Sequence, residues 1–398
     1  MLTADNFLDN IHASPILIVD DNPINRIFIE KTLQANGYNR LLSVASSEEA
    51  LEKIILFNPD LIVLDIMMPG MDGFDCCRAI HSQPDYRDLP ILIQTTLTEP
   101  ELRVKAFAMG AADFISKPIY PEELCARVAV HLEKRLLLKN LQLYKNRMEL
   151  ELESARQLQQ AILPGASEIS YIEKICNLDI ASHFRPSSEI GGDFWGMKNL
   201  FAHQTAFWMV DFSGHGVAAA LNSFRLQAYL KEHSSLAARP GEYLSHLNDK
   251  LLHLLLRGQF ATMFYGIIDT QSNQLFYACA CSTHPIILRK ATGKSQFIDG
   301  SGNPLGIGMH MYPTNTIPFM AGDLLLLYSD ALTETANPKG EYITEKIIKE
   351  ILDKYKDESA NHIKNAILDY LKLHAGDKLS DDLTIAICKR SSSINYNK

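Results

Sequence analysis

Acidic residues recur in the C-terminal half of the chain at places where they could share one metal site. They are Asp193 after two glycines, Asp211 ahead of Ser-Gly-His-Gly, Asp330, and the pair Asp381 and Asp382. Apolar runs over 206–210 and 324–329 lead directly into Asp211 and Asp330, which would hold both carboxylates at strand ends. Mg²⁺ and Mn²⁺ prefer oxygen ligands, and two such ions can activate water and hold a phosphate. The pattern predicts a dinuclear metal site that hydrolyses phosphate esters without a Cys or Ser nucleophile.

Length and composition indicate a soluble globular chain of two or more domains. The 398 residues are 46% hydrophobic and 21% charged, and one core rarely organises so many residues. No apolar run approaches the ~18 residues of a membrane span. The first residues include Asp5 and Asp9 and lack the basic segment of a signal peptide. We therefore expect a cytoplasmic protein without membrane insertion. The formal net charge of -9 argues against a nucleic-acid partner.

Short apolar runs in the first 128 residues each end in a side chain that could do chemistry. The runs 16–19, 61–64, 91–94 and 114–116 lead into Asp20 with Asp21, Asp65, Thr95, and Lys117 with Pro118. Helical stretches are expected over 23–36, 46–57, 74–81 and 100–109. Unalternating strands separated by helices predict a doubly wound α/β fold with a parallel sheet. In such sheets the functional site lies beyond the carboxyl ends of the strands.

These residues, in this order and spacing, resemble the CheY-like receiver domain of bacterial response regulators from Ser14 to Val128. The resemblance implies that Asp65 is the phospho-acceptor and that an upstream histidine kinase or phosphotransfer protein supplies the phosphoryl group. It also implies roles for the neighbouring residues: Mg²⁺ binding by Asp20, Asp21, Asp65 and the Met67 carbonyl, phosphoryl pairing by Lys117, and a two-state switch through Thr95 and Phe114.

One residue departs from the receiver pattern. Thr96 stands where the family usually has Ala, and its added bulk beside the pocket predicts altered phosphotransfer or slower loss of the acyl phosphate. Each receiver residue taken alone also has a structural reading. The acidic pair could be a solvated cap, and Lys117-Pro118 could be an ordinary turn.

The connecting segment predicts one long helix, because 130–162 contains neither Gly nor Pro. Apolar residues recur in it at spacings of three and four: Leu137, Leu141, Tyr144, Met148, Ala155, Leu158 and Ile162. The spacing fits a short coiled coil with Lys134 and Glu151 as polar interruptions of the seam, and so predicts a homodimer. The alternative is an amphipathic helix that lies on its own domains.

Beyond Pro164 the pattern changes to alternating strands, including 261–270 and 274–281, with helices near 217–233 and 241–256. This arrangement predicts an α+β fold, a β-sandwich flanked by helices. The residues here resemble the SpoIIE-type branch of the metal-dependent (PPM) Ser/Thr protein phosphatases. The matching segments are 185–195, 211–216, 260–263, 302–306, 328–334 and 380–384.

The phosphatase resemblance implies a role for each acidic residue and two Mn²⁺ or Mg²⁺ ions. The implied ligands are Asp211, which bridges the metals, the Phe212 carbonyl, and Asp193, Asp330 and Asp381. Asp382 would orient the site. Arg185 would clamp the phosphate, with an ordinary surface Arg as the alternative.

The expected organisation has five parts. They are a tail over 1–13, a receiver domain over 14–128, a helical coiled-coil linker over 129–163, a phosphatase domain over 164–392, and a tail over 393–398. The interpretation is a response regulator whose receiver controls a phosphoserine/phosphothreonine phosphatase. The family resemblance suggests a phosphorylated anti-sigma-factor antagonist of the STAS type as its substrate. Two alternatives stay open: a non-catalytic adaptor that binds a regulatory protein, and an acyl-phosphatase that acts on Asp65 of the same chain.

Overall fold

The computed structural model describes residues 11–95, 104, 106–188, 190–214, 216–232, 234–376 and 379–391. The chain divides into two compact units, Met1–Met148 and Glu149–Lys398, and each is described by itself. Thr96 and half of the helix expected over 100–109 (100–103 and 105) lie outside the described residues, although 104 and 106–108 are helical. The predicted domain boundaries stay predictions.

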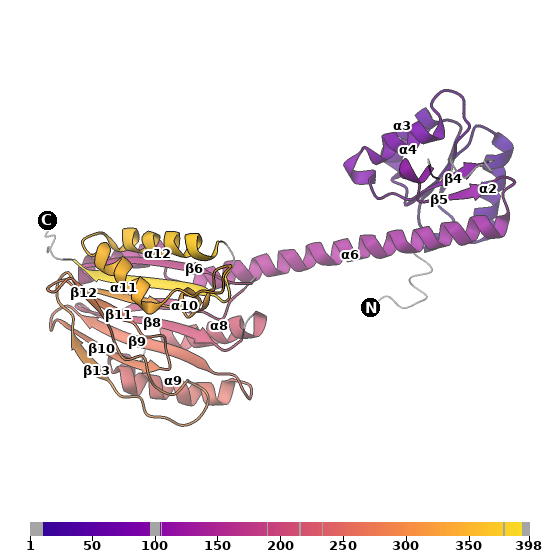
Figure 1. The fold of residues 1–398 in the computed structure, drawn as a ribbon. Coiled ribbons are helices and arrows are strands. Elements are labelled where there is room, and N and C mark those ends of the chain that lie inside the picture. The colour runs from indigo at the N-terminus through magenta and orange to yellow at the C-terminus, as the bar shows by residue number, and fades with distance from the viewer. Residues whose placement is uncertain are drawn as a thin grey trace. The chain divides into compact units, whose positions relative to one another are not determined.

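The first unit is a parallel five-stranded sheet in the order β2-β1-β3-β4-β5 (Figure 1). Its strands are β1 (Ile16–Val19), β2 (Leu41–Val44), β3 (Leu61–Asp65), β4 (Ile91–Thr95) and β5 (Asp113–Ser116). Between them lie α2 (Pro23–Ala35), α3 (Ser47–Phe57), α4 (Gly73–His81) and the 3₁₀ turn η1 (Pro84–Tyr86). The doubly wound fold is therefore confirmed, and β2 is a strand that the sequence pattern did not reveal.

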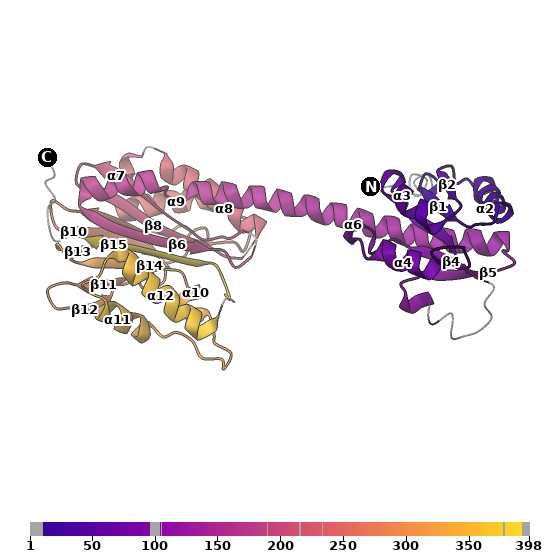
Figure 2. The ribbon, with the colours of Figure 1, turned by 90° about the horizontal axis from the view of Figure 1, so that it is seen from above.

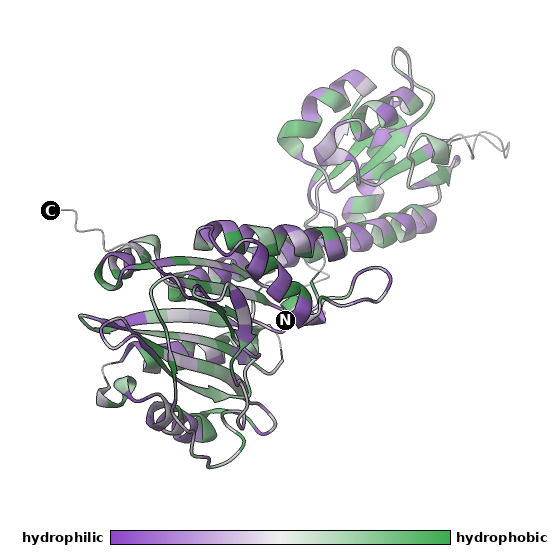
Figure 3. Cartoon of the chain, turned by 60° about the vertical axis from the view of Figure 1, so that its left-hand side comes forward, coloured by the Kyte–Doolittle hydropathy of each residue, from purple (hydrophilic) through white to green (hydrophobic). Residues whose placement is uncertain are grey.

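Local sequence explains where the receiver helices begin. Asn22, Ser46 and Asp72 each accept a backbone N–H of the first turn of the helix that follows, which satisfies a donor that a helix start leaves unpaired. Strand residues are apolar on both faces, as the green strands of this unit show in Figure 3. One face packs against α3 and α4, and the other packs against α2 and the first turns of the long helix α6.

Helix α6 runs without a break from Pro121 to Ile162 (Figure 2), which confirms the predicted long helix. Its first turns belong to the receiver core, because Leu124, Val128 and Leu132 are fully buried there. From 140 to 151 every residue is exposed.

The second unit is a sandwich of two antiparallel sheets, in the orders β13-β10-β9-β8-β7 and β12-β11-β14-β15-β6. The first sheet comprises β7 (Phe194–Phe201), β8 (Gln204–Phe212), β9 (Ala261–Asp269), β10 (Gln274–Ala280) and β13 (Asn315–Pro318). The second comprises β6 (Leu178–Arg185), β11 (Ile286–Arg289), β12 (Lys294–Phe297), β14 (Leu324–Tyr328) and β15 (Leu383–Arg390).

Helices cover the outer faces of this sandwich, as predicted. They are α8 (Val217–Lys231), the 3₁₀ turn η2 (Ser235–Ala238), α9 (Pro240–Leu254), α10 (Ala331–Glu334), α11 (Glu345–Lys354) and α12 (Ala360–Ala375), whereas α7 (Ala166–Cys176) packs against the layer between the sheets. Helices α8 and α9 pack on the first sheet, while α11 and α12 pack on the second. One apolar layer lies between the sheets and one lies under each helix pair.

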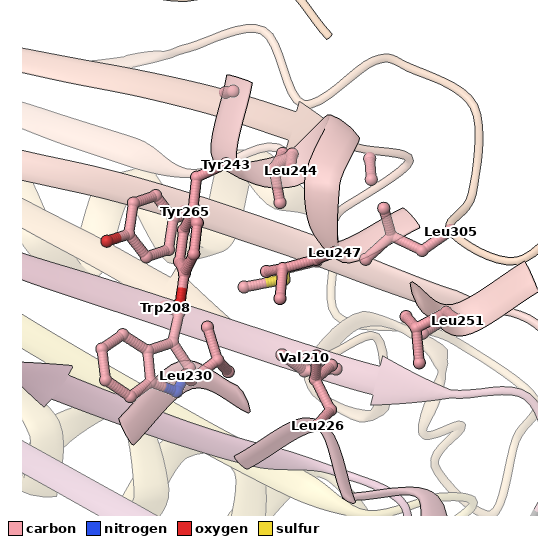
Figure 4. Packing of buried hydrophobic residues seen from close by; sticks show 14 of the residues in the cluster. Trp208, Val210, Leu226, Leu230, Tyr243, Leu244, Leu247, Leu251, Tyr265 and Leu305 are labelled. Carbon is pink, nitrogen blue, oxygen red and sulfur yellow. The ribbon is translucent and has the colours of Figure 1, made fainter. Parts of the chain in front are cut away.

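The layer under α8 and α9 is built around aromatic rings (Figure 4). Trp208 stacks on Tyr265 with ring centroids 6.3 Å apart, and Tyr243 meets the edge of Tyr265 at 5.0 Å. Trp208 also fills the space over Gly196, where an added Cβ would lie 2.4 Å from the indole ring. The strands next to Asp193 and Asp211 therefore rest on a closely packed support. No described helix combines the length and the hydrophobicity that crossing a membrane requires.

Candidate functional site

The receiver unit gathers its acidic residues beyond the carboxyl ends of β1 and β3. Asp20 and Asp65 are buried, Asp21 is exposed, and one carboxylate oxygen from each lies within 4.8 Å of the others. The Met67 backbone N–H donates to Asp65 Oδ1 at 3.4 Å. Three hard oxygen donors at this spacing fit a Mg²⁺ ion.

Lys117, which follows β5, completes this cluster. Its Nζ contacts Asp65 Oδ2 at 2.5 Å and Asp20 Oδ2 at 3.2 Å. Burial raises the pKa of Asp65, and the Lys117 ammonium opposes that shift. Lys117 therefore keeps negative charge on a buried carboxylate and stands where charge on an incoming phosphoryl group would need neutralising.

The predicted switch residues lie on the neighbouring strands. Thr95 is buried at the end of β4, and its carbonyl accepts the Lys117 backbone N–H at 2.8 Å. Phe114 in β5 is half-buried and meets the edge of Phe107 with ring centroids 6.2 Å apart. Arg127 of α6 lies over the Phe114 ring at 5.4 Å. Phe114 therefore touches the long helix directly.

The second unit gathers its acidic residues at one end of the sandwich. Asp193 precedes β7, and Asp211 is the penultimate residue of β8. Asp330 follows β14, and Asp381 and Asp382 precede β15. The antiparallel pairs Phe194 with Val210 and Tyr328 with Ile385 bring these strand ends to the same edge of each sheet. Strand pairing thus converts dispersed sequence positions into one site.

Asp193 and Asp211 are the most strongly perturbed acids of this group. Burial and then the neighbouring Asp211 charge raise the pKa of Asp193 well above its usual value. Burial raises the pKa of Asp211 to about 7, although the hydrogen bond with Asp193 acts in the opposite direction and lowers this pKa. Burial, with Glu334 and Asp381 nearby, raises the pKa of Asp330 to about 6. Asp193 is buried and both Asp211 and Asp330 are half-buried, so the site concentrates carboxylates in a partly buried place.

The donor set fits divalent cations. All the side chains that converge are carboxylates, and within the described part of the chain no Lys or Arg side chain forms an ion pair with Asp193, Asp211, Asp330 or Asp381. The Phe212 carbonyl oxygen lies 3.0 Å from the place where a Cβ of Gly192 would be, so it faces the same loop. Buried carboxylates without a cationic partner are costly unless a metal neutralises them.

Asp382 differs from its neighbour Asp381 in what it contacts. Asp381 is exposed, whereas Asp382 is buried and accepts the backbone N–H groups of Ser187 at 2.8 Å and Gly192 at 2.7 Å. A Cβ on Gly191 would lie 2.0 Å from Asp382 Oδ2, so only glycine allows this approach. Asp382 therefore holds the loop that carries Asp193, in keeping with the orienting role predicted for it.

Gln159 of α6 also holds this loop, and no sequence pattern indicated this role. Its Nε2 donates to the Gly191 carbonyl at 2.7 Å, and its Oε1 accepts the Gly191 N–H at 3.1 Å. The side chain is buried, although the next residue, Gln160, is exposed. The last turns of the long helix are thus bonded to the loop next to Asp193.

The sequence predicts that Arg185 clamps the phosphate. Arg185 ends β6 as an exposed residue and lies opposite Leu383, which packs in the outer layer under α12. Residues that face each other across an antiparallel pair share a face, so Arg185 belongs to the outer face. Its role as a phosphate clamp stays a prediction, as does the alternative of an ordinary surface Arg.

A cavity of about 140 Å³ adjoins the carboxylates between the two sheets. Asp211 and Asp330 line it together with the apolar side chains of Phe264 and Leu327 and the segment that contains Thr283. It offers space for a substrate group next to the acidic residues.

Two family models match the chain. Residues 16–129 match the response regulator receiver domain, and residues 202–391 match Stage II sporulation protein E (SpoIIE). Together with the fold and the acidic clusters, these matches define a signalling protein of two parts. The chain joins a response-regulator receiver domain to a SpoIIE-family domain of the PPM protein phosphatase type.

Individual relatives match one part at a time. Over 119 residues the chain is 42% identical to the transcriptional regulatory protein YvrH of Bacillus subtilis (strain 168). The matched stretch covers 30% of this chain and 49% of that protein. Response regulator MprA of Mycolicibacterium vanbaalenii is 40% identical over 119 residues, 30% of this chain and 50% of that protein. The chain thus spans about half the length of these curated relatives.

Among solved structures, the SiaA-PP2C domain of Pseudomonas aeruginosa is similar over 61% of this chain and 96% of that chain. The TM-score is 0.54 and the sequence identity 20%, so the likeness shows a shared fold.

In EDTA, the second unit should lose stability as the pH rises from about 4 to about 7. The folded-state pKa values of Asp211, about 7, and Asp330, about 6, exceed the ~3.9 of an unfolded Asp. Between those values the folded chain holds protons that the unfolded chain releases, so stability falls with rising pH. Urea midpoints followed by the fluorescence of Trp195 and Trp208 measure this.

Two variants test whether this pH dependence of stability comes from the acidic site or from other carboxylates of the unit. Asp211→Asn should flatten the pH dependence, and Asp249→Asn, on an exposed position of α9, should leave it unchanged. An equal slope in wild type and Asp211→Asn would contradict the assignment of the charge repulsion to Asp211.

Proposed function

We propose that this chain is a response regulator in which phosphorylation of Asp65 controls a metal-dependent phosphoserine/phosphothreonine protein phosphatase. The observation that carries the proposal is the convergence of Asp193, Asp211, Asp330 and Asp381 at one end of a sandwich whose fold is that of a PP2C domain. Asp193 is buried and Asp211 is half-buried; the two are hydrogen-bonded, and neither has a cationic partner among the described residues, as expected for ligands of a divalent ion.

Each residue of the site has a task that its position supports. Asp211, Asp193, Asp330, Asp381 and the Phe212 carbonyl would hold two Mn²⁺ or Mg²⁺ ions. Such ions, when bound, supply a water of lowered pKa and neutralise charge on the phosphate. Asp382 positions the Asp193 loop through Gly192. The cavity beside Asp211 and Asp330 would receive the phosphorylated side chain.

Phosphate release by the full chain tests the enzyme directly. With Mn²⁺ and a phosphoserine peptide, wild type should turn over, and Asp211→Asn should lose at least about 100-fold in rate because the removed charge binds metal and transition state together. Asp249→Asn serves as the control. Turnover that is equal in wild type and Asp211→Asn would contradict the proposal.

The adaptor alternative makes the opposite forecast from the same experiment. A phosphatase-like domain that only binds a partner would show neither turnover nor Mn²⁺ binding. The intact set of carboxylates favours the enzyme. An acyl-phosphatase acting on Asp65 would instead show a phospho-receiver lifetime that depends on Asp211.

Control of the phosphatase by the receiver has a physical route in α6. Phe114 contacts this helix through Arg127, and Gln159 of the same helix bonds both polar groups of Gly191. Gln227 of α8 also donates to the Ile162 carbonyl at the helix end, at 2.7 Å. A rotation or repacking of α6 would therefore act on the loop that carries Asp193.

Gln159→Ala should weaken metal binding rather than substrate binding. It removes two buried hydrogen bonds from Gly191, two residues ahead of the proposed ligand Asp193. We expect a loss in metal affinity of about 10-fold, the lower end of what removal of a direct hydrogen-bond partner of a metal ligand costs. The measurement is the half-saturating Mn²⁺ concentration for turnover, with KM for the peptide determined separately.

Gln160→Ala is the matched control, because its side chain is exposed one residue further along the helix. A merely structural role for Gln159 would lower the yield of folded protein and leave the Mn²⁺ requirement of the folded fraction unchanged.

The partners follow from the two domains. The receiver implies an upstream histidine kinase or phosphotransfer protein, and we propose a cytoplasmic pathway for both. The proposed substrate is a phosphoprotein such as an anti-sigma-factor antagonist of the STAS type, as the family resemblance suggests.

We also propose that α6 pairs with a second copy of itself. Leu141 is 64% exposed and Tyr144 is 65% exposed on the predicted seam, and no described residue covers them. Exposed apolar side chains at alternating spacings of three and four are the signature of a coiled-coil seam.

Light scattering of the full chain tests this pairing. Wild type should have about twice the monomer mass of 44.7 kDa. Leu141→Glu should shift it to monomer, while Leu143→Glu should leave the dimer intact, because Leu143 is equally exposed (67%) but lies off the seam. A monomeric wild type, or equal behaviour of the two variants, would contradict the seam.

A further inference from the structure

A second cavity, of about 210 Å³, lies on the receiver far from Asp65. It is lined by residues 87–90 ahead of β4, by Gly110 and Ala112 ahead of β5, and by α6. Asp65 and Lys117 lie at the carboxyl ends of β3 and β5, whereas this cavity lies at the amino ends of β4 and β5. The amino and carboxyl ends of parallel strands lie at opposite ends of the sheet, so the cavity is separate from the phosphorylation site.

Three cationic side chains line this cavity: Arg87, Lys134 and Arg135. Within the described part of the chain, none of them forms an ion pair. Other cations of α6 do, since Arg127 pairs with Asp113 and Lys139 pairs with Asp60. Asp88 is the one carboxylate that lines the cavity, which leaves a net charge of +2 in a chain whose formal net charge is -9.

Arg135 carries a buried donor that lacks an acceptor. Its Nη1 donates to the Asp88 carbonyl at 3.2 Å, but its Nε is buried with no hydrogen-bond partner among the described residues. An unpaired buried donor costs about 1–3 kcal/mol, more when it is charged. An anion in the cavity would supply the acceptor and offset the positive charge.

The two histidines of the cavity are already engaged. His81 Nε2 lies 2.9 Å from the Leu89 carbonyl, and His131 Nε2 lies 3.3 Å from Asp113 Oδ2. They serve as walls, together with the apolar side chains of Leu89 and Leu138. The cations are therefore the groups left to bind a ligand.

We propose that this cavity binds a small molecule that carries a phosphate group. A phosphate monoester holds a charge of about -1.5 to -2 at neutral pH, which matches the cavity's net charge better than a single carboxylate does. Arg guanidinium groups suit phosphate oxygens because their N–H donors lie in a rigid plane. The apolar walls leave room for the organic part. Because Lys134 and Arg135 belong to α6, the ligand would bridge this helix and the segment ahead of β4.

Pyridoxal 5′-phosphate is a suitable probe on the full chain. Its aldehyde condenses with a Lys ε-amine, a C=N bond forms and water leaves, and added borohydride then reduces this imine to a stable secondary amine. Peptide mass spectrometry should find Lys134 labelled at least 10-fold faster than Lys53, an exposed lysine of α3. Pyridoxal, which lacks the phosphate, should show no preference, and inorganic phosphate should compete with the probe.

Variants assign the selectivity to the cavity. Arg135→Gln and Arg87→Gln should each reduce Lys134 labelling at least 5-fold. Arg87 is exposed, so its variant keeps the fold even if Arg135→Gln does not. Arg78→Gln, which removes an exposed cation paired with Asp75 at 3.1 Å, should have no effect. Labelling of Lys134 at the rate of Lys53, equal labelling by pyridoxal, or labelling unchanged in Arg87→Gln would overturn the proposal.

Discussion

The loop that carries Asp193 is held by two buried side chains from distant parts of the chain. Asp382, which lies just ahead of β15, accepts the Gly192 N–H. Gln159, which lies near the end of α6, hydrogen-bonds to both the N–H and the carbonyl of Gly191. Gly191 fits because a side chain there would collide with Asp382. Everything else in the acidic site depends on this loop, because it sets Asp193 against Asp211.

The same loop would link the proposed metal site to the proposed regulatory helix. Burial of Asp193 beside Asp211 raises both pKa values, so the site is unfavourable until a cation neutralises it. A small displacement of the loop changes the distance between two repelling carboxylates, and with it the affinity for a divalent ion. A hydrogen bond from α6 at this place therefore has more influence on chemistry than one elsewhere on the sandwich would have.

Sequence patterns predicted the strand ends but not the contacts that hold them. Asp65, Lys117, Asp211 and Asp330 could be predicted because each follows an apolar run. Strand pairing within each unit then gathers the strand ends of that unit at one side of its sheets. Gln159 could not be predicted, since it lies beside Gln160 in a polar helix and only burial against Gly191 distinguishes the two. The short strand β2 was missed because Leu41–Val44 holds only one fully buried residue.

Hydrogen–deuterium exchange of the peptide containing Gly191 tests the central claim most directly. Beryllofluoride with Mg²⁺ mimics a phosphorylated Asp65, and it should change the exchange of the Gly191 and Gly192 amides in wild type. The change should be absent in Asp65→Asn, which controls for beryllofluoride at the acidic site of the sandwich. If beryllofluoride is shown to be bound to the receiver and the exchange of these amides is unchanged in wild type, the proposed route from Asp65 through α6 to the loop that carries Asp193 is contradicted.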